Sequence, residues 1–240
     1  MAVLEDHGVE RVYHFSPLHY LAFIARSRSL LSKPRLLRLG FEIVHFRSMS
    51  RKHDVNRGFE YYVHMTLHEY PRIARSKLAA GFPHIRIEVP SVAVDRRRFD
   101  LCRYNIAMTR YLRRGGSPGF PESSTNGRYY AAQQVPTART DADKAAMLRK
   151  YLGTDTVIEV LVEEEMPLPD ETTVSCFSRE DEWIAREVVE ALDAPWNVVR
   201  TEPDGPYPRD AFYANEVGTF LDRAIQNPQW RGSGLEFDRV

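Results

Sequence analysis

The stretch from Val157 to Val162 reads Val-Ile-Glu-Val-Leu-Val and has apolar side chains at both alternating sets of positions, except at Glu159. A short run that is apolar on both faces predicts an interior β-strand. A carboxylate in such a strand is costly unless it is paired or faces a cleft. Two interpretations are open at this point. Either Glu159 is a functional carboxylate held on a rigid strand, or the strand is an irregular edge strand with Glu159 in water.

Length and composition restrict the class of protein. A chain of 240 residues can bury a substantial core, and its hydrophobic fraction of 43% is typical of a globular protein. It has no apolar run of the roughly 18 residues needed to span a membrane, and Met1–Asp6 lacks the pattern of a secretory signal. Cys102 and Cys176 are too few and too far apart for a disulfide framework or a zinc site. We therefore expect a cytoplasmic protein with no membrane contact and no metal.

The zero net charge conceals two parts of opposite charge. Residues 21–150 contain 25 Lys and Arg against 10 Asp and Glu, whereas residues 151–240 contain 7 against 20. Either the first part binds a polyanion that the last part avoids, or the two parts attract each other. Arg dominates the basic set, and its planar guanidinium suits bidentate contacts with phosphate.

The predicted elements show no regular β-α-β alternation, which indicates an α+β fold. Strands are expected at residues 11–15, 41–46, 61–67, 84–89, 157–162, 172–177 and 196–199. Helices are expected after Ser16 and at residues 69–80, 105–114, 140–152, 179–192 and 211–225. No GxGxxG or GxxxxGK[ST] pattern is present, so the sequence supports neither a Rossmann nor a P-loop nucleotide site.

Local signals mark the ends of several elements. Ser16 is expected to cap a helix that has Pro17 in its first turn, where free N–H groups favour a phosphate. His14 at the preceding strand end is either a ligand-binding or a structural histidine. Thr140–Asp143 resembles a capping box. The three glutamates at 163–165 are expected to form a solvated turn.

Four segments, in chain order, carry a resemblance to a known family. The first is Val12–Leu21, in which His-Phe-Ser leads from a strand into a helix. The second is a basic segment upstream of the strand that contains Tyr62-Val63. The third is Arg103–Thr109, and the fourth is Ile158–Val162, followed by Met166-Pro167 and an apolar strand. Together these segments resemble the DarT family of NAD-dependent ADP-ribosyltransferases, which modify bases in single-stranded DNA and are usually toxins paired with a macrodomain antitoxin.

The resemblance implies a fold and a domain organisation. The expected core is the split mixed or antiparallel β-sheet of an ADP-ribosyltransferase with flanking helices, formed by residues 1–200. Residues 201–240 would be a Pro-rich linker and an acidic helical extension of the same domain.

The resemblance also implies an active site with NAD as co-substrate and no metal. Glu159 would be the catalytic glutamate and Asn105 the polar active-site residue. Arg47 and Arg51 are both candidates for the active-site arginine, which would meet the NAD phosphates or activate the target base. His14 and Ser16 would hold the nicotinamide end of NAD, and Tyr20 stands where the family has Asn.

The loop at 115–140, just before the catalytic strand, is where transferases of this class recognise their acceptor. Its tyrosines would stack a splayed base while nearby arginines follow the backbone, or the tyrosines simply anchor the loop. The candidates are Arg110, Arg113, Arg114, Arg128, Tyr129 and Tyr130. The expected function is transfer of ADP-ribose to a base in single-stranded DNA, as the toxin of a toxin-antitoxin or phage-defence system. The alternatives are RNA or protein as acceptor, or a nucleic-acid-binding module without catalysis.

Overall fold

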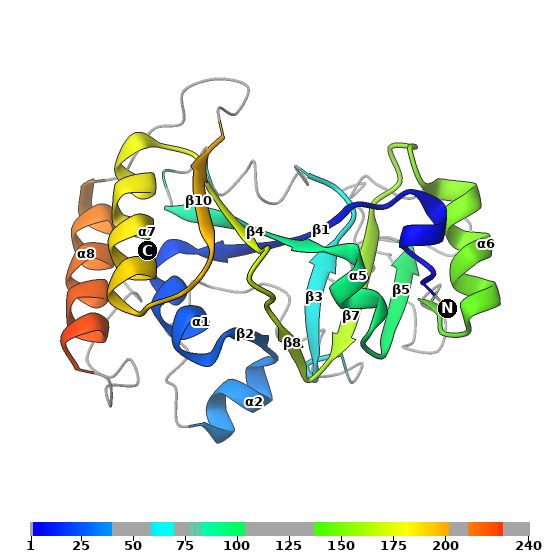
Figure 1. Cartoon of the computed structure of the whole chain (residues 1–240), viewed down its shortest axis with the longest axis horizontal. Helices are drawn as coiled ribbons and strands as arrows, with labels where there is room; N and C mark the ends of the chain where they lie inside the picture. Colours follow the sequence, from blue (N-terminus) through cyan, green and yellow to red (C-terminus); the bar gives the residue numbers. More distant parts are fainter. Residues whose placement is uncertain are drawn as a thin grey trace, which may run out of the picture.

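The computed structural model describes residues 2–39, 59–69, 78, 81, 83–103, 137–201 and 211–227, with the backbone alone for 211–216. Within these ranges the chain forms one eight-stranded sheet in the order β10-β9-β4-β1-β3-β7-β5-β6 (Figure 1). Its strands are β1 (Arg11–Pro17), β3 (Tyr62–Thr66), β4 (His84–Pro90), β5 (Phe99–Arg103), β6 (Thr137–Ala138), β7 (Ile158–Glu163), β9 (Thr173–Cys176) and β10 (Asn197–Arg200). A two-stranded sheet pairs β2 (Ser29–Leu31) with β8 (Glu165–Pro167).

The described helices flank the sheet. They are η1 (Glu5–His7), η2 (Leu18–Tyr20), α1 (Leu21–Ser27), α2 (Lys33–Arg38), α5 (Ser91–Asp95), α6 (Asp141–Tyr151), α7 (Arg179–Ala191) and α8 (Ala211–Gln226). Helices α1, α7 and α8 pack together beside the end of the sheet that carries β10, and α6 packs on β5 and β6 at the other end (Figure 1). None of the described helices combines the length and apolar character that crossing a bilayer requires.

Strand pairing makes this an α+β fold with a mixed sheet, as the sequence predicted. Every described pair of strands is antiparallel except β9 and β10, which are parallel. The strand predicted at 41–46 and the helix predicted at 105–114 lie outside the described residues, and so does nearly all of the helix predicted at 69–80.

The sheet is divided between β1 and β3. Strand β1 pairs with β4 along its whole length, from Arg11 to Pro17, but pairs with β3 only where Tyr13 lies opposite Thr66. On the far side of that junction, β3 pairs with β7 over all five of its residues. Two four-stranded halves therefore meet at a single residue pair, which is the split sheet that the resemblance implied.

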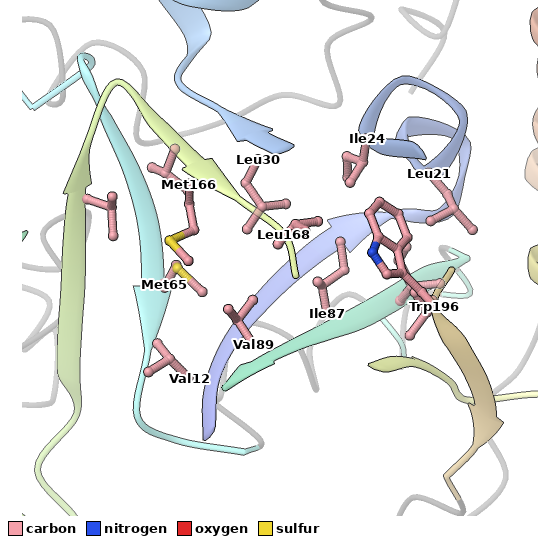
Figure 2. Packing of buried hydrophobic residues seen from close by; sticks show 14 of the residues in the cluster. Val12, Leu21, Ile24, Leu30, Met65, Ile87, Val89, Met166, Leu168 and Trp196 are labelled. Atoms are coloured by element: carbon pink, nitrogen blue, oxygen red, sulfur yellow. The ribbon is translucent and has the colours of Figure 1, made fainter. Parts of the chain in front are cut away.

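The two faces of the sheet differ in character. Side chains of opposed residues in antiparallel strands share a face, and successive residues alternate between faces. One face is apolar and lies in the main core, where Val12, Met65 and Ile87 meet side chains from α1, β2 and β8. Figure 2 shows Met65 and Met166 pointing toward each other in this core. The opposite face is largely polar.

The capping box predicted at Thr140 is confirmed. The hydroxyl of Thr140 accepts a hydrogen bond from the main-chain N–H of Asp143 at 3.2 Å, at the start of α6. The helix cap predicted at Ser16 is wrong. Ser16 lies within β1 opposite Ile85, and the N–H of Leu18 bonds to the carbonyl of Pro83, so pairing with β4 continues past the serine. The helix α1 begins only after the η2 turn.

Glu164, between β7 and β8, and Glu165, the first residue of β8, pair with α2. Glu164 has a positive φ of 56°, and its carboxylate lies 2.7 Å from the guanidinium of Arg38. The carboxylate of Glu165 lies 3.1 Å from the guanidinium of Arg35. The main-chain N–H of Glu164 also donates to the carbonyl of Tyr61 at 2.7 Å. The two glutamates are thus partly exposed, but their carboxylates also contact α2. The sequence analysis expected only a solvated turn here.

Candidate active site

Glu159 lies on the polar face of β7, one strand away from the split. Strand β7 runs between β3 and β5, which confirms the predicted interior strand. The residue is only 5% exposed, and Thr66 and Cys102 lie directly opposite it on the two neighbouring strands. Since Thr66 also lies opposite Tyr13, one row of four side chains crosses the junction of the two halves. The structure therefore favours a buried, positioned carboxylate over one that lies in water on an edge strand.

Thr66 fixes the backbone beside Glu159. Its hydroxyl donates to the carbonyl of Ile158 at 3.2 Å and accepts from the N–H of His68 at 3.1 Å. Nearby, the ring of His68 contacts the carbonyl of Thr156 at 2.8 Å. The start of β7 is thus held by side chains as well as by the ladder of main-chain bonds.

His14 spans the gap between the two halves just beyond the junction. Its Nδ1 lies 2.8 Å from the main-chain carbonyl of His64 on β3, so Nδ1 must carry the proton. Burial lowers the pKa of His14, partly opposed by this hydrogen bond. In the neutral ring, Nδ1–H donates to the His64 carbonyl, so Nε2 carries no proton and can accept a hydrogen bond.

His64 is a site residue that the sequence analysis missed. It shares the polar face of β3 with Thr66, since both occupy alternate positions of that strand. Its Nδ1 lies 3.4 Å from Oε1 of Glu159, and its Nε2 lies 2.9 Å from the carbonyl of Phe59. The alternation of Tyr62-Val63-His64-Met65-Thr66 already carried the signal, because it puts the histidine on the polar face.

Ser16 and Tyr20 lie in different surroundings. Ser16 is buried in β1, and its hydroxyl donates to the carbonyl of Pro17 at 3.3 Å. The ring of Tyr20 packs 4.4 Å from that of His19 and 6.4 Å from that of Phe23, and burial raises its pKa. The structure thus places Tyr20 in an aromatic group near α1.

A second charged cluster lies on the polar face of β4 and β9. The buried guanidinium of Arg86 contacts the carboxylates of Glu88 at 2.6 Å and Glu69 at 3.0 Å. It also lies over the ring of Tyr13, at 5.3 Å from the ring centre, while Ser175 donates to Glu88. Tyr13 therefore connects this cluster to the row that contains Glu159.

The other predicted site residues lie outside the described part of the chain. They are Arg47, Arg51, Asn105, Arg110, Arg113, Arg114, Arg128, Tyr129 and Tyr130. Within the described residues, no group of three or more His, Cys, Asp and Glu side chains could hold a metal.

No protein-family model and no curated protein matches the chain. Solved structures of DarT from Thermus sp. 2.9 do resemble it. The complex with NAD+ has 14% sequence identity and a TM-score of 0.50, over 81% of this chain and 96% of that one. The complex with ADP-ribosylated ssDNA has 14% identity and a TM-score of 0.47, over 84% and 93% of the two chains. That with carba-NAD+ has 14% identity and a TM-score of 0.45, over 80% and 96%. The chain is therefore DarT-like in fold, with a sequence far diverged from these structures.

Proposed function

We propose that the protein is an NAD-dependent mono-ADP-ribosyltransferase that transfers ADP-ribose to a base in single-stranded DNA. The observation that carries the proposal is Glu159, a buried carboxylate on the polar face of an interior strand, next to the split in the sheet. A carboxylate held there, in a fold shared with a DarT bound to NAD+, is suited to glycosyl transfer.

The chemistry needs a fixed carboxylate. When the bond from nicotinamide to the ribose breaks, positive charge develops on the anomeric carbon and the ring oxygen. Glu159 can stabilise that charge by binding a ribose hydroxyl, or it can deprotonate the incoming nucleophile. His14, neutral and with Nδ1–H committed to the His64 carbonyl, offers Nε2 to a donor on the nicotinamide end. Ser16 and either Arg47 or Arg51 would complete the NAD site.

Charge supports nucleic acid as the acceptor. Residues 21–150 carry the excess of Lys and Arg, while the acidic excess lies after residue 150. A protein that neutralises several phosphates loses affinity steeply as salt rises. Binding of a single-stranded oligonucleotide should therefore weaken strongly between low and physiological salt. Affinity that does not change with salt would count against this acceptor.

The test is transfer by wild type and two matched variants. Purified protein is incubated with NAD and with single-stranded DNA, RNA or a protein mixture, and products are identified by mass spectrometry. Glu159→Gln should lower transfer at least about 100-fold, because it removes the charge that stabilises the transition state. Glu163→Gln, on the same strand and face but 47% exposed, should keep wild-type activity. Normal turnover by a folded Glu159→Gln protein would refute the assignment.

The biological role that we propose is that of a toxin neutralised by a macrodomain antitoxin. Expression of the wild type alone should then arrest growth, while Glu159→Gln should not. A macrodomain protein encoded by the adjacent gene should remove ADP-ribose from the modified DNA and restore growth. Growth arrest that persists in the Glu159→Gln variant would separate toxicity from transfer.

A further inference from the structure

His64 faces an oxygen atom with each of its ring nitrogens. Nδ1 lies 3.4 Å from the carboxylate of Glu159, and Nε2 lies 2.9 Å from the main-chain carbonyl of Phe59. Carboxylate and carbonyl oxygens only accept hydrogen bonds. A neutral imidazole has one N–H, so it can donate a hydrogen bond to one of these oxygens while the lone pair of its other nitrogen faces the second. The imidazolium ion can donate to both.

The main chain of His64 is fixed as well. Its carbonyl accepts the Nδ1–H of His14 at 2.8 Å across the split, and the residue lies opposite Leu161 in the ladder of β3 and β7. The ring therefore projects from a backbone that is held on both sides. Such a residue can set the orientation of the carboxylate beside it.

We propose that His64, as an imidazolium ion, is the positioning residue that holds the carboxylate of Glu159 in its orientation for ADP-ribosyl transfer. This inference rests on the proposed function. It assigns to the histidine a contact with Glu159 and not with substrate. Charge-assisted hydrogen bonds are roughly twice as strong as neutral ones. Loss of the imidazolium proton should therefore weaken the contact and lower transfer about tenfold.

The pH dependence follows from the groups around His64. The charged groups near it on the same face of the sheet include Glu159 on β7 and, one strand further on, Asp100 of β5, which lies opposite Leu161. His14 on β1 contacts the main-chain carbonyl of His64. Burial lowers the pKa of His14, so that ring is neutral at pH 7 and contributes no charge. Leu161, directly opposite on β7, is apolar. Transfer should thus fall as the pH rises through the range in which His64 loses its proton.

Two substitutions separate this role from a packing role. In His64→Asn the amide nitrogen can take the place of Nδ1 and still donate to Glu159, but it does not titrate. In His64→Leu no donor remains. Across pH 5–9, the decline of kcat/KM seen in wild type should vanish in both variants. At pH values below the range of that decline, the kcat/KM of His64→Asn should stay within about threefold of wild type. The kcat/KM of His64→Leu should be lower by about tenfold or more. His7→Asn, which changes a histidine of η1 whose Nδ1 lies 2.8 Å from the carbonyl of Val3, should keep the wild-type profile.

A measurement independent of activity completes the test. ¹⁵N chemical shifts of His64 at pH 7 should show both ring nitrogens protonated in wild type and only one in Glu159→Gln. A neutral His64 ring in wild type would overturn the proposal, and so would wild-type pH profiles in both His64 variants. Failure of wild type to consume NAD would instead refute the proposed function, whatever the ¹⁵N shifts show.

Discussion

Tyr13 of β1 lies opposite Thr66 of β3, and in the described part of the chain this is the one pair that joins the two halves of the sheet. Thr66 lies opposite Glu159 on the next strand. Directly opposed residues have Cβ atoms about 4.5–5.5 Å apart. The position of the catalytic candidate is thus tied to the junction of the halves through one threonine.

Thr66→Val should destabilise the protein by about 1–3 kcal/mol. Valine keeps the shape of the side chain but removes the hydroxyl that bonds to the carbonyl of Ile158 and the N–H of His68, and each such bond is worth about 0.5–1.5 kcal/mol. Urea unfolding measures the change. Thr66→Ser keeps the hydroxyl and should retain most of the stability. If the Val variant is as stable as the Ser variant, these hydrogen bonds contribute nothing.

Arg86→Met should cost about 3–5 kcal/mol of unfolding free energy. The substitution leaves the carboxylate of Glu88 without the buried guanidinium beside it, and breaking a buried ion pair carries a penalty of this size. The double variant Arg86→Met/Glu88→Gln should recover part of the loss, because the remaining group is neutral. Urea unfolding of both proteins gives the comparison. Equal stability of wild type and the single variant would contradict the prediction.

Phe220→Ala should lower stability by about 3–5 kcal/mol. Phe220 of α8 is fully buried, and its ring packs edge-on against that of Phe23 at 5.3 Å. We propose that residues 201–240 extend the same domain, so thermal unfolding should shift as one transition. Trp183→Ala on α7, where the side chain is 65% exposed, should change stability by less than about 0.5 kcal/mol. A separate early transition in Phe220→Ala would mean that α8 unfolds independently.

Asp181→Asn should stabilise the protein at neutral pH. Burial raises the pKa of Asp181 from its ordinary value of 3.8 to about 6, although a hydrogen bond with Ser178 opposes the shift. The folded state therefore favours the neutral carboxyl, and ionisation above pH 6 costs up to about 3 kcal/mol. The advantage of the Asn variant should be complete near pH 7 and disappear as the pH falls below 3.8. A stability difference that does not vary with pH would contradict this.

The sequence predicted β7 and the α+β fold because these depend on local alternation. Glu159 stood out for the same reason, since a lone carboxylate in an apolar strand is visible without any structure. Ser16 shows where local reasoning fails. Its capping signal was outweighed by pairing between β1 and β4, whose residues are about seventy positions apart.

The contacts of His14 and His64 could not be predicted from local signals either. His14 bonds to a main-chain carbonyl fifty residues away, and no side-chain pattern marks a carbonyl acceptor. His64 gains its significance from the register that places it between Phe59 and Glu159. Register between distant strands depends on tertiary packing. The charge pattern and the motif spacing of the sequence therefore did not identify His64 as a candidate site residue.

Glu164 contacts residues on both sides of the segment that contains Arg47 and Arg51. Its carboxylate holds Arg38, just before that segment, and its main-chain N–H holds Tyr61, just after it. Arg38 and Tyr61, on the two sides of that segment, thus contact the same residue, five positions beyond Glu159. Glu164→Ala should therefore remove the contact with Arg38 but keep the main-chain bond to Tyr61, so that amide hydrogen exchange rises in α2 and not at the start of β3.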